Sequence, residues 1–183
     1  ECVFSRSELA ANLRGDIYHE SLMDYYTLLN QQGLTGQLFE TALKERVCQS
    51  LQNHYDKNSY KWFGIYPVIW DLILTDIQEK LACFVVKDAE YLKGFVPQIF
   101  ETSFEKIYAP SPQLRLKLKG TVDRIDIDWK NKRFRVLDYK SSLSGKKGLA
   151  EIMFKQVILQ PFIYLILASE QPQTKGLQKD GAA

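Results

Sequence analysis

The sequence predicts an α/β fold in which helices come first, three antiparallel strands follow and a last helix ends the order. Apolar residues recur at helical spacing over the first half of the chain, whereas residues 97–141 alternate between apolar and polar with a period of two. Proline, glycine and asparagine residues separate these segments. Because 45% of the 183 residues are hydrophobic, the chain can fill one core, and we expect a single domain over residues 1–183.

Three helices are expected in the mainly helical part of the chain, residues 1–95. The first runs from about residue 13 to Asn30, and Gly33 suits its C-terminal cap. The second runs from about residue 38 to Asn53. The third runs from Pro67 to Asp88, since proline is tolerated in the first turn of a helix.

Residues 96–170 are expected to form a sheet and the helix that follows it. The expected strands are Pro97–Lys106, Leu114–Asp128 and Phe134–Ser141. A loop with two glycines and two lysines at 142–148 leads to a helix at Glu151–Ser169. Residues 171–183 are expected to be a polar tail.

The hairpin between the second and third strands brings two aspartates together. A two-residue turn at Lys130–Asn131 would place Asp123 directly opposite Asp138. Directly opposed residues share a face of the sheet, with Cβ atoms about 5 Å apart. Two carboxylates this close repel each other unless a divalent cation lies between them. Lys140 projects from the same face, because it follows Asp138 by two residues.

These groups are suited to phosphodiester hydrolysis. Asp123 and Asp138 can hold Mg²⁺ or Mn²⁺ through oxygen atoms, with the backbone carbonyl of Tyr139 as a further ligand. Such a metal polarises the phosphoryl oxygen and lowers the pKa of a bound water. Lys140 would orient that water or stabilise charge in the transition state.

Other polar residues in these strands are expected to be structural. Asp126 and Asp128 fit a surface hairpin with scattered exposed charges. Arg124 points away from Asp123 and is expected to form a structural ion pair.

Alternation in the first strand divides its residues between two faces of the sheet. Ile99, Glu101 and Ser103 are expected on one face, and Phe100, Thr102 and Phe104 on the other.

The hairpin resembles a known family. Residues 120–126 read Gly-Thr-Val-Asp-Arg-Ile-Asp, and residues 136–141 read Val-Leu-Asp-Tyr-Lys-Ser. Together and in this order they resemble the PD-(D/E)XK nuclease superfamily, and in particular the RecB-like exonuclease domains of helicase–nucleases and CRISPR-associated exonucleases. The resemblance implies a restriction-endonuclease-like core, here with an N-terminal helical elaboration.

Residues 14–19 extend the resemblance toward the start of the chain. They are similar to an R-G-x-x-x-H motif, which implies that His19 is a metal ligand. Without that match, a lone histidine on an amphipathic helix would be expected to have a structural role and not to bind a metal. Residues 97–104 resemble a segment that carries E-x-x-F, which makes Glu101 a further candidate. Glu101 would approach the metal through water or pair with a basic residue.

The last helix carries the other motif of the resemblance. Gln160 and Tyr164 fit Q-x-x-x-Y, which implies that both face the active centre and help to position DNA. The alternative is a helix that packs through Tyr164. Gln156 lies one turn earlier and replaces Gln160 if the register differs. Relatives carry a strand after this helix, whereas residues 174–183 have no β-rich stretch, so we expect that strand to be missing.

The resemblance favours a metal-dependent deoxyribonuclease, RecB-like and exonucleolytic, that acts on single strands or duplex ends in DNA recombination and repair. Phosphate contacts without sequence specificity are expected from Lys146, Lys147 and Lys155. The alternative is a catalytically silent nuclease-like module that binds DNA or serves as a scaffold in a repair complex. A sequence-specific restriction enzyme is a third option, but no base-recognition element is visible. The sequence leaves exonuclease and endonuclease action both open.

Composition adds limits on the setting. The net charge of +2 neither supports nor opposes a nucleic-acid partner. No apolar run is long enough to span a membrane and no signal peptide is visible, so a cytoplasmic protein is expected. The chain begins at Glu1, so we expect it to be part of a longer protein, which could include a helicase.

Cysteine spacing argues against a disulfide framework, a zinc site built from the cysteines alone and an iron–sulfur cluster. Cys2, Cys48 and Cys83 are far apart and are expected to be buried free thiols. The clustered downstream cysteines that hold an iron–sulfur cluster in some relatives are absent, so such a cluster is not expected in this chain. His54 matches no motif and is expected at the surface.

Overall fold

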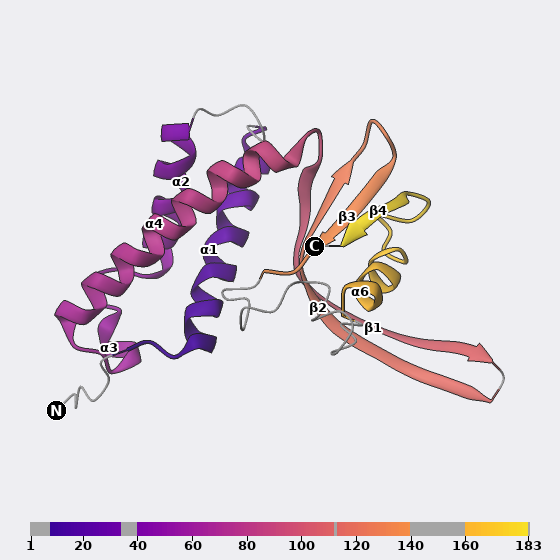
Figure 1. Ribbon diagram of the computed structural model, residues 1–183, viewed down its shortest axis with the longest axis horizontal. Coiled ribbons are helices and arrows are strands. Elements are labelled where there is room, and N and C mark those ends of the chain that lie inside the picture. The colour runs from indigo at the N-terminus through magenta and orange to yellow at the C-terminus, as the bar shows by residue number, and fades with distance from the viewer. Residues whose placement is uncertain (1–7, 34–39, 112, 140–159, 183) are drawn as a thin grey trace, which may run out of the picture. The chain divides into compact units, whose positions relative to one another are not determined.

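The computed structural model describes residues 8–33, 40–111, 113–139 and 160–182. The chain divides into two compact units, Glu1–Lys93 and Gly94–Ala183. The first is helical, and the second contains the sheet (Figure 1). Each unit is described by itself below.

The first unit contains the three expected helices. They are α1 (Ala11–Gln31), α2 (Glu40–His54) and α4 (Pro67–Leu92). Gly33 has a φ of 64° just beyond α1, and Pro67 occupies the first turn of α4, as the sequence indicates. A four-residue helix, α3 (Tyr60–Phe63), was not expected, because one turn is too short to show a periodic pattern.

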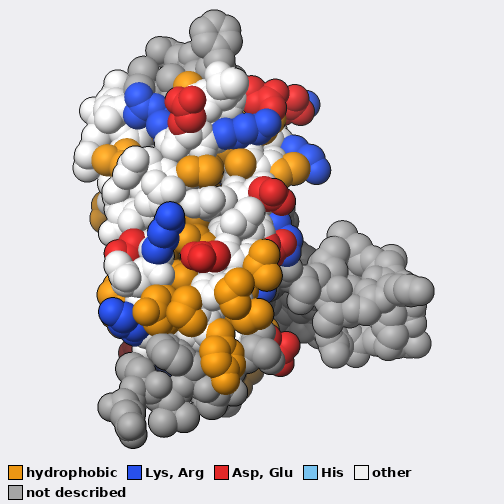
Figure 2. All heavy atoms as spheres, turned by 90° about the vertical axis from the view of Figure 1, so that its left-hand side faces the viewer, with side chains coloured by type: hydrophobic (Ala, Val, Ile, Leu, Met, Phe, Trp, Pro, Cys, Tyr) orange, Lys and Arg blue, Asp and Glu red, His pale blue; other side chains and the backbone are white. Residues whose placement is uncertain are grey.

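The core of the first unit comes from the apolar stripes of its three long helices. Fully buried members include Ile17, Val47, Leu51, Trp70 and Ile77. The Tyr26 hydroxyl donates a buried hydrogen bond to Asp88, which links the first and last of these helices. Large apolar side chains also remain exposed, and orange groups gather on the face seen in Figure 2.

Two minor expectations concern this unit. His54 is exposed and lies 3.8 Å from Asp24, which confirms its surface position. Cys48 is half-buried but Cys83 is exposed, so the expectation of a buried thiol is wrong for Cys83. Cys83 lies on the solvent side of α4, because the apolar stripe of this helix passes through Leu81 and Val85 instead. Cys2 lies outside the described residues.

The second unit contains a four-stranded mixed sheet in the order β1-β2-β3-β4. Its strands are β1 (Val96–Ser111), β2 (Leu114–Asp128), β3 (Arg133–Leu137) and β4 (Gln178–Ala182). The first three are antiparallel neighbours, as expected, and β4 pairs with β3 in parallel. The expectation of three antiparallel strands therefore describes β1, β2 and β3 but misses the parallel strand β4.

The strand β4 corrects the expectation of a polar tail without a strand. Its sequence, Gln-Lys-Asp-Gly-Ala, has no apolar alternation. An edge strand can nevertheless form through backbone pairing and side-chain contacts with its one neighbour. The Gln178 N–H donates to the Lys132 carbonyl at 2.8 Å, and Arg133 pairs with Asp180 at 2.9 Å.

The hairpin between β2 and β3 has the expected register but a longer turn. Arg124 pairs with Leu137 and Asp128 pairs with Arg133, as a hairpin centred on residues 130 and 131 requires. Residues 129–132 form the turn instead of two residues, and Lys132 adopts a φ of 51°. The carboxylate of Asp128 accepts hydrogen bonds from the backbone and side-chain nitrogens of Asn131, which stabilises this wider turn.

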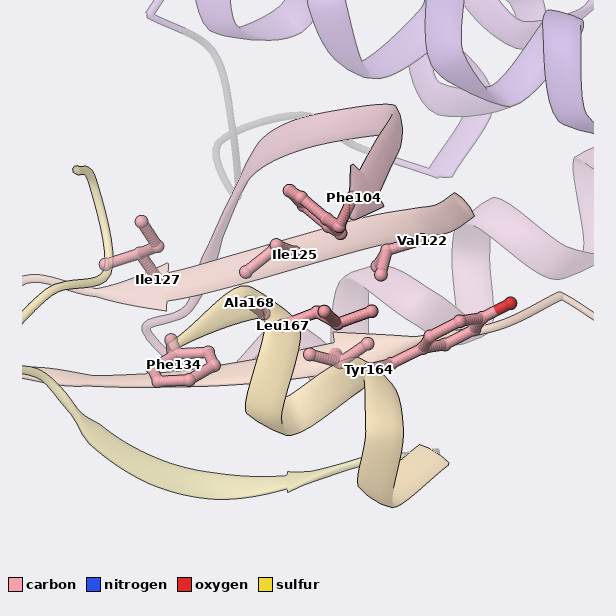
Figure 3. Close-up of a cluster of buried hydrophobic side chains, with 9 residues drawn as sticks. Phe104, Val122, Ile125, Ile127, Phe134, Tyr164, Leu167 and Ala168 are labelled. Carbon is pink, nitrogen blue, oxygen red and sulfur yellow. The ribbon is translucent and has the colours of Figure 1, made fainter. Parts of the chain in front are cut away.

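The helix α6 (Gln160–Ala168) covers one face of the sheet and forms part of the predicted helix 151–169. Residues 151–159 lie outside the described residues. Figure 3 shows side chains of α6 packed against the sheet. This core consists of Phe104, Val122, Ile125, Ile127, Phe134, Val136, Tyr164, Leu167 and Ala168.

Candidate metal centre

Two carboxylates meet where β1 and β2 lie side by side. Asp123 on β2 is buried, with 6% of its surface exposed, and Glu101 on β1 is half-buried. An oxygen of one carboxylate lies within 4.8 Å of an oxygen of the other. Closely spaced, partly desolvated carboxylates favour a divalent cation, because the cation removes their mutual repulsion.

The backbone of β1 is irregular at this point, and the side chains of β2 depart from strict alternation. Glu101 has a φ of 41°, which is unusual for a residue with a side chain and costs on the order of 1–3 kcal/mol. Val122 and Ile125 both pack into the core beneath α6, although they are three residues apart. Strict alternation would place them on opposite faces. Irregularities of this kind often redirect side chains near active sites.

The third strand leads toward the same place. The β2–β3 ladder ends at the pair Arg124–Leu137, so Asp138 is the first residue after the last paired position. Asp138 is half-buried. The backbone N–H of Tyr139 donates a 2.5 Å hydrogen bond to Oδ2 of Asp123, which ties the end of β3 to the buried carboxylate. A hydrogen bond to a carboxylate favours its ionised form, the form that binds a metal.

A buried ion-pair network adjoins Asp123 in the chain. Arg124 and Asp126 are fully buried, and Nε of Arg124 lies 2.7 Å from Oδ1 of Asp126. Arg135 lies 2.9 Å from Oδ2 of Asp126, and its guanidinium also stacks over the ring of Phe95 at 4.4 Å. Burial raises the pKa of the Asp126 carboxyl, and the two arginines oppose this rise. The expected structural ion pair of Arg124 is confirmed.

The expectation that Asp126 and Asp128 are scattered surface charges is wrong. Asp126 is 0% exposed and Asp128 is 2% exposed. Each has a structural partner from the facing strand, since Arg135 contacts Asp126 and Arg133 contacts Asp128. The sequence did contain a signal for these ion pairs. In the hairpin register, Arg135 lies opposite Asp126 and Arg133 lies opposite Asp128.

Arg124 also connects the network to the candidate centre. Its Nη1 donates to the Tyr139 hydroxyl at 3.1 Å, and its guanidinium lies 5.8 Å from the centre of that ring. The backbone of the same tyrosine donates to Asp123. Nothing in the sequence indicates this role for Tyr139, which was expected to contribute only its carbonyl.

The other predicted site residues are distributed as follows. His19 is half-buried on α1 in the first unit. Gln160 is the first residue of α6, and Tyr164 is buried on the same helix. Its ring packs on Gly120, where an added Cβ would lie 2.6 Å from Cε1 of the tyrosine. The remaining candidates, Lys140, Lys146, Lys147, Lys155 and Gln156, lie outside the described residues.

Within the part of the chain that the structure describes, no helix is both long and apolar enough to cross a membrane.

Comparison with known proteins identifies one family. The sequence model of the PD-(D/E)XK nuclease superfamily matches residues 3–183. No curated protein matches the chain significantly.

Proposed function

Since the chain belongs to the PD-(D/E)XK nuclease superfamily, we propose that it is an Mg²⁺- or Mn²⁺-dependent deoxyribonuclease of the RecB-like type. It hydrolyses phosphodiester bonds from single strands or duplex ends without sequence specificity, as part of DNA recombination and repair in the cytoplasm. A helicase domain or subunit acts with it. The observation that carries the proposal is the close approach of the Glu101 and Asp123 carboxylates on neighbouring strands.

The donor set fits the metal. Asp123 and Asp138 are its proposed carboxylate ligands, the Tyr139 carbonyl adds a third oxygen, and Glu101 joins them directly or through water. Mg²⁺ and Mn²⁺ prefer such hard oxygen donors. His19 is proposed as a nitrogen ligand on the strength of its R-G-x-x-x-H motif. An imidazole ligand would favour Mn²⁺ over Mg²⁺.

Each group has a separate task. The bound metal would polarise the scissile phosphoryl group and supply hydroxide near neutral pH. Lys140 orients the attacking water or stabilises negative charge as it develops. Gln160 and Tyr164 help to position DNA, and Lys146, Lys147 and Lys155 contact phosphates. The Tyr139 N–H holds the Asp123 carboxylate in place.

The direct test is cleavage of linear DNA with Mg²⁺, Mn²⁺ or EDTA. Asp138→Asn should lower the rate at least about 100-fold, which corresponds to the loss of about 3 kcal/mol of transition-state stabilisation. Asp71→Asn is the matched control, because Asp71 is exposed on α4 and this substitution removes the same charge as Asp138→Asn. If the wild type cuts no faster than Asp138→Asn with any divalent metal but still binds DNA, the silent DNA-binding module is the correct description.

A further inference from the structure

The outer parts of β1 and β2 form a two-stranded ribbon that extends past α6 (Figure 1). The pairing is continuous from Phe104–Gly120 to Tyr108–Leu116, and Ser111 pairs with Leu114 near the tip. We call residues 103–121 the arm. Tyr164 of α6 packs on Gly120, at the inner end of the arm. Most side chains farther out are exposed on both faces.

One face of the arm carries a row of cations. On β2, Gly120 faces Tyr164 of α6 and Val122 lies in the core beneath α6. Because side chains alternate along a strand, the odd-numbered residues up to Thr121 point to the face away from α6. The hydroxyls of Ser103 and Thr121, 2.8 Å apart, mark this second face. Farther out on β2 it presents Lys119, Lys117 and Arg115, all exposed.

The charge of the arm is unbalanced. Residues 103–121 contain four basic side chains and one acidic side chain. The acid, Glu105, lies 2.9 Å from Lys117, and this lysine lowers the pKa of the Glu105 carboxyl. Lys106 lies on the face of the arm toward α6 and pairs with Glu170 at 2.8 Å. The face with Arg115, Lys117 and Lys119 therefore keeps an excess of positive charge.

The cationic row ends next to the candidate metal centre. Arg115, Lys117, Lys119 and Thr121 follow one another along β2 at intervals of two residues, and Asp123 comes two residues after Thr121. Each interval is about 6.6 Å along a strand. On the paired strand, Glu101 comes two residues before Ser103. The alternation of side chains breaks at these two carboxylates, so they are placed by their position at the inner end of the row. A polyanion lying along the cationic face would reach this inner end.

We propose that the cationic face of the arm binds the sugar–phosphate backbone of the nucleic-acid substrate and guides it to the metal centre. This inference rests on the proposed nuclease function. Evenly spaced basic side chains are suited to repeated phosphates and carry no sequence information. A two-stranded ribbon also fits the major groove of a duplex. The opposite face exposes Tyr108, Leu114 and Leu116, which would instead fit a protein partner, but it lacks the row of cations.

The test measures binding without cleavage. A labelled DNA duplex and a single strand are titrated by fluorescence anisotropy in EDTA over a range of salt concentrations. The variant carries Arg115→Gln, Lys117→Gln and Lys119→Gln. Affinity for the duplex should fall at least about 10-fold at low salt, and the slope of log K against log[salt] should fall by about 0.9 for each phosphate that the variant no longer neutralises.

A second variant controls for charge. Lys130→Gln, Lys175→Gln and Lys179→Gln remove the same charge from exposed positions of the same unit outside the arm. This control should bind and cleave DNA like the wild type, and thermal unfolding should show that both variants are folded. If the two variants bind alike, the arm proposal is overturned, even if the wild type cleaves DNA. If the wild type fails to cleave DNA but only the arm variant loses binding, the nuclease proposal alone fails.

Discussion

Gly120 provides a test of how α6 is seated on the sheet. A Cβ at this position would lie 2.6 Å from Cε1 of Tyr164 and 3.4 Å from Cδ1. Because carbon atoms pack at about 3.5–4.0 Å, the ring would have to move by roughly 1 Å. The backbone itself permits alanine, since Gly120 is not one of the glycines with a positive φ. Gly120→Ala should therefore cost about 1–3 kcal/mol through overpacking.

Urea unfolding of Gly120→Ala, alone and combined with changes at Tyr164, would measure this cost. Tyr164→Phe keeps the ring atom that clashes, so Gly120→Ala should cost as much in that background as in the wild type. Tyr164→Leu removes the ring, and the cost should then fall by at least about 1 kcal/mol. An equal cost in all three backgrounds, or no cost in any, would refute the close approach of α6 to Gly120.

Other predictions concern the ion pairs and the metal. Asp126→Ala should lower the free energy of unfolding by about 3–5 kcal/mol, because Arg124 and Arg135 would lose the buried carboxylate that they share; a loss below about 1 kcal/mol in urea would contradict it. The pKa of Asp128 is lowered to about 2, chiefly by hydrogen bonds from Asn131. Because this lies below the unfolded value of about 3.9, its stabilisation is complete above that pH and is lost as the pH falls toward 2; Asp128→Asn should flatten this dependence in acid-unfolding curves, and parallel curves would count against it. Mn²⁺ at about 100 times its Kd should raise the free energy of unfolding by about 2.7 kcal/mol, and Asp123→Asn should abolish most of this gain in calorimetry; equal gains in both proteins would mean that the metal binds elsewhere.

The sequence predicted the elements that have strong periodic patterns. The three long helices and the register of the β2–β3 hairpin follow from apolar spacing and turn residues. The weak elements were not predictable in this way. The single turn α3 is too short for a pattern, and β4 is polar because it is an edge strand that needs no apolar face.

For the candidate site, the sequence indicated which residue types could bind a metal better than it indicated which acidic side chains are buried. Asp126 and Asp128 look like exposed charges in the sequence, because acidic side chains are rarely buried. Their burial depends on arginines from the facing strand, and only the paired structure shows that these arginines neutralise them. The hydrogen bond from the Tyr139 backbone to Asp123 is likewise invisible in the sequence, since every residue except proline has such a donor.

The break in alternation explains why the two faces of the first strand were assigned wrongly from the sequence. Strict alternation places Ile99 and Phe104 on opposite faces, yet both contact the core beneath α6. One residue between them must leave the regular pleat, and Glu101, with a φ of 41°, has the conformation that does so.

The neighbouring strand breaks its pattern at the same level, between Val122 and Ile125. At this level Arg124 enters the buried ion pair, while Asp123 accepts the Tyr139 N–H and approaches Glu101. Paired irregularities in adjacent strands, with a strained backbone at one of the two carboxylates, are expected where a fold sacrifices stability to form a site.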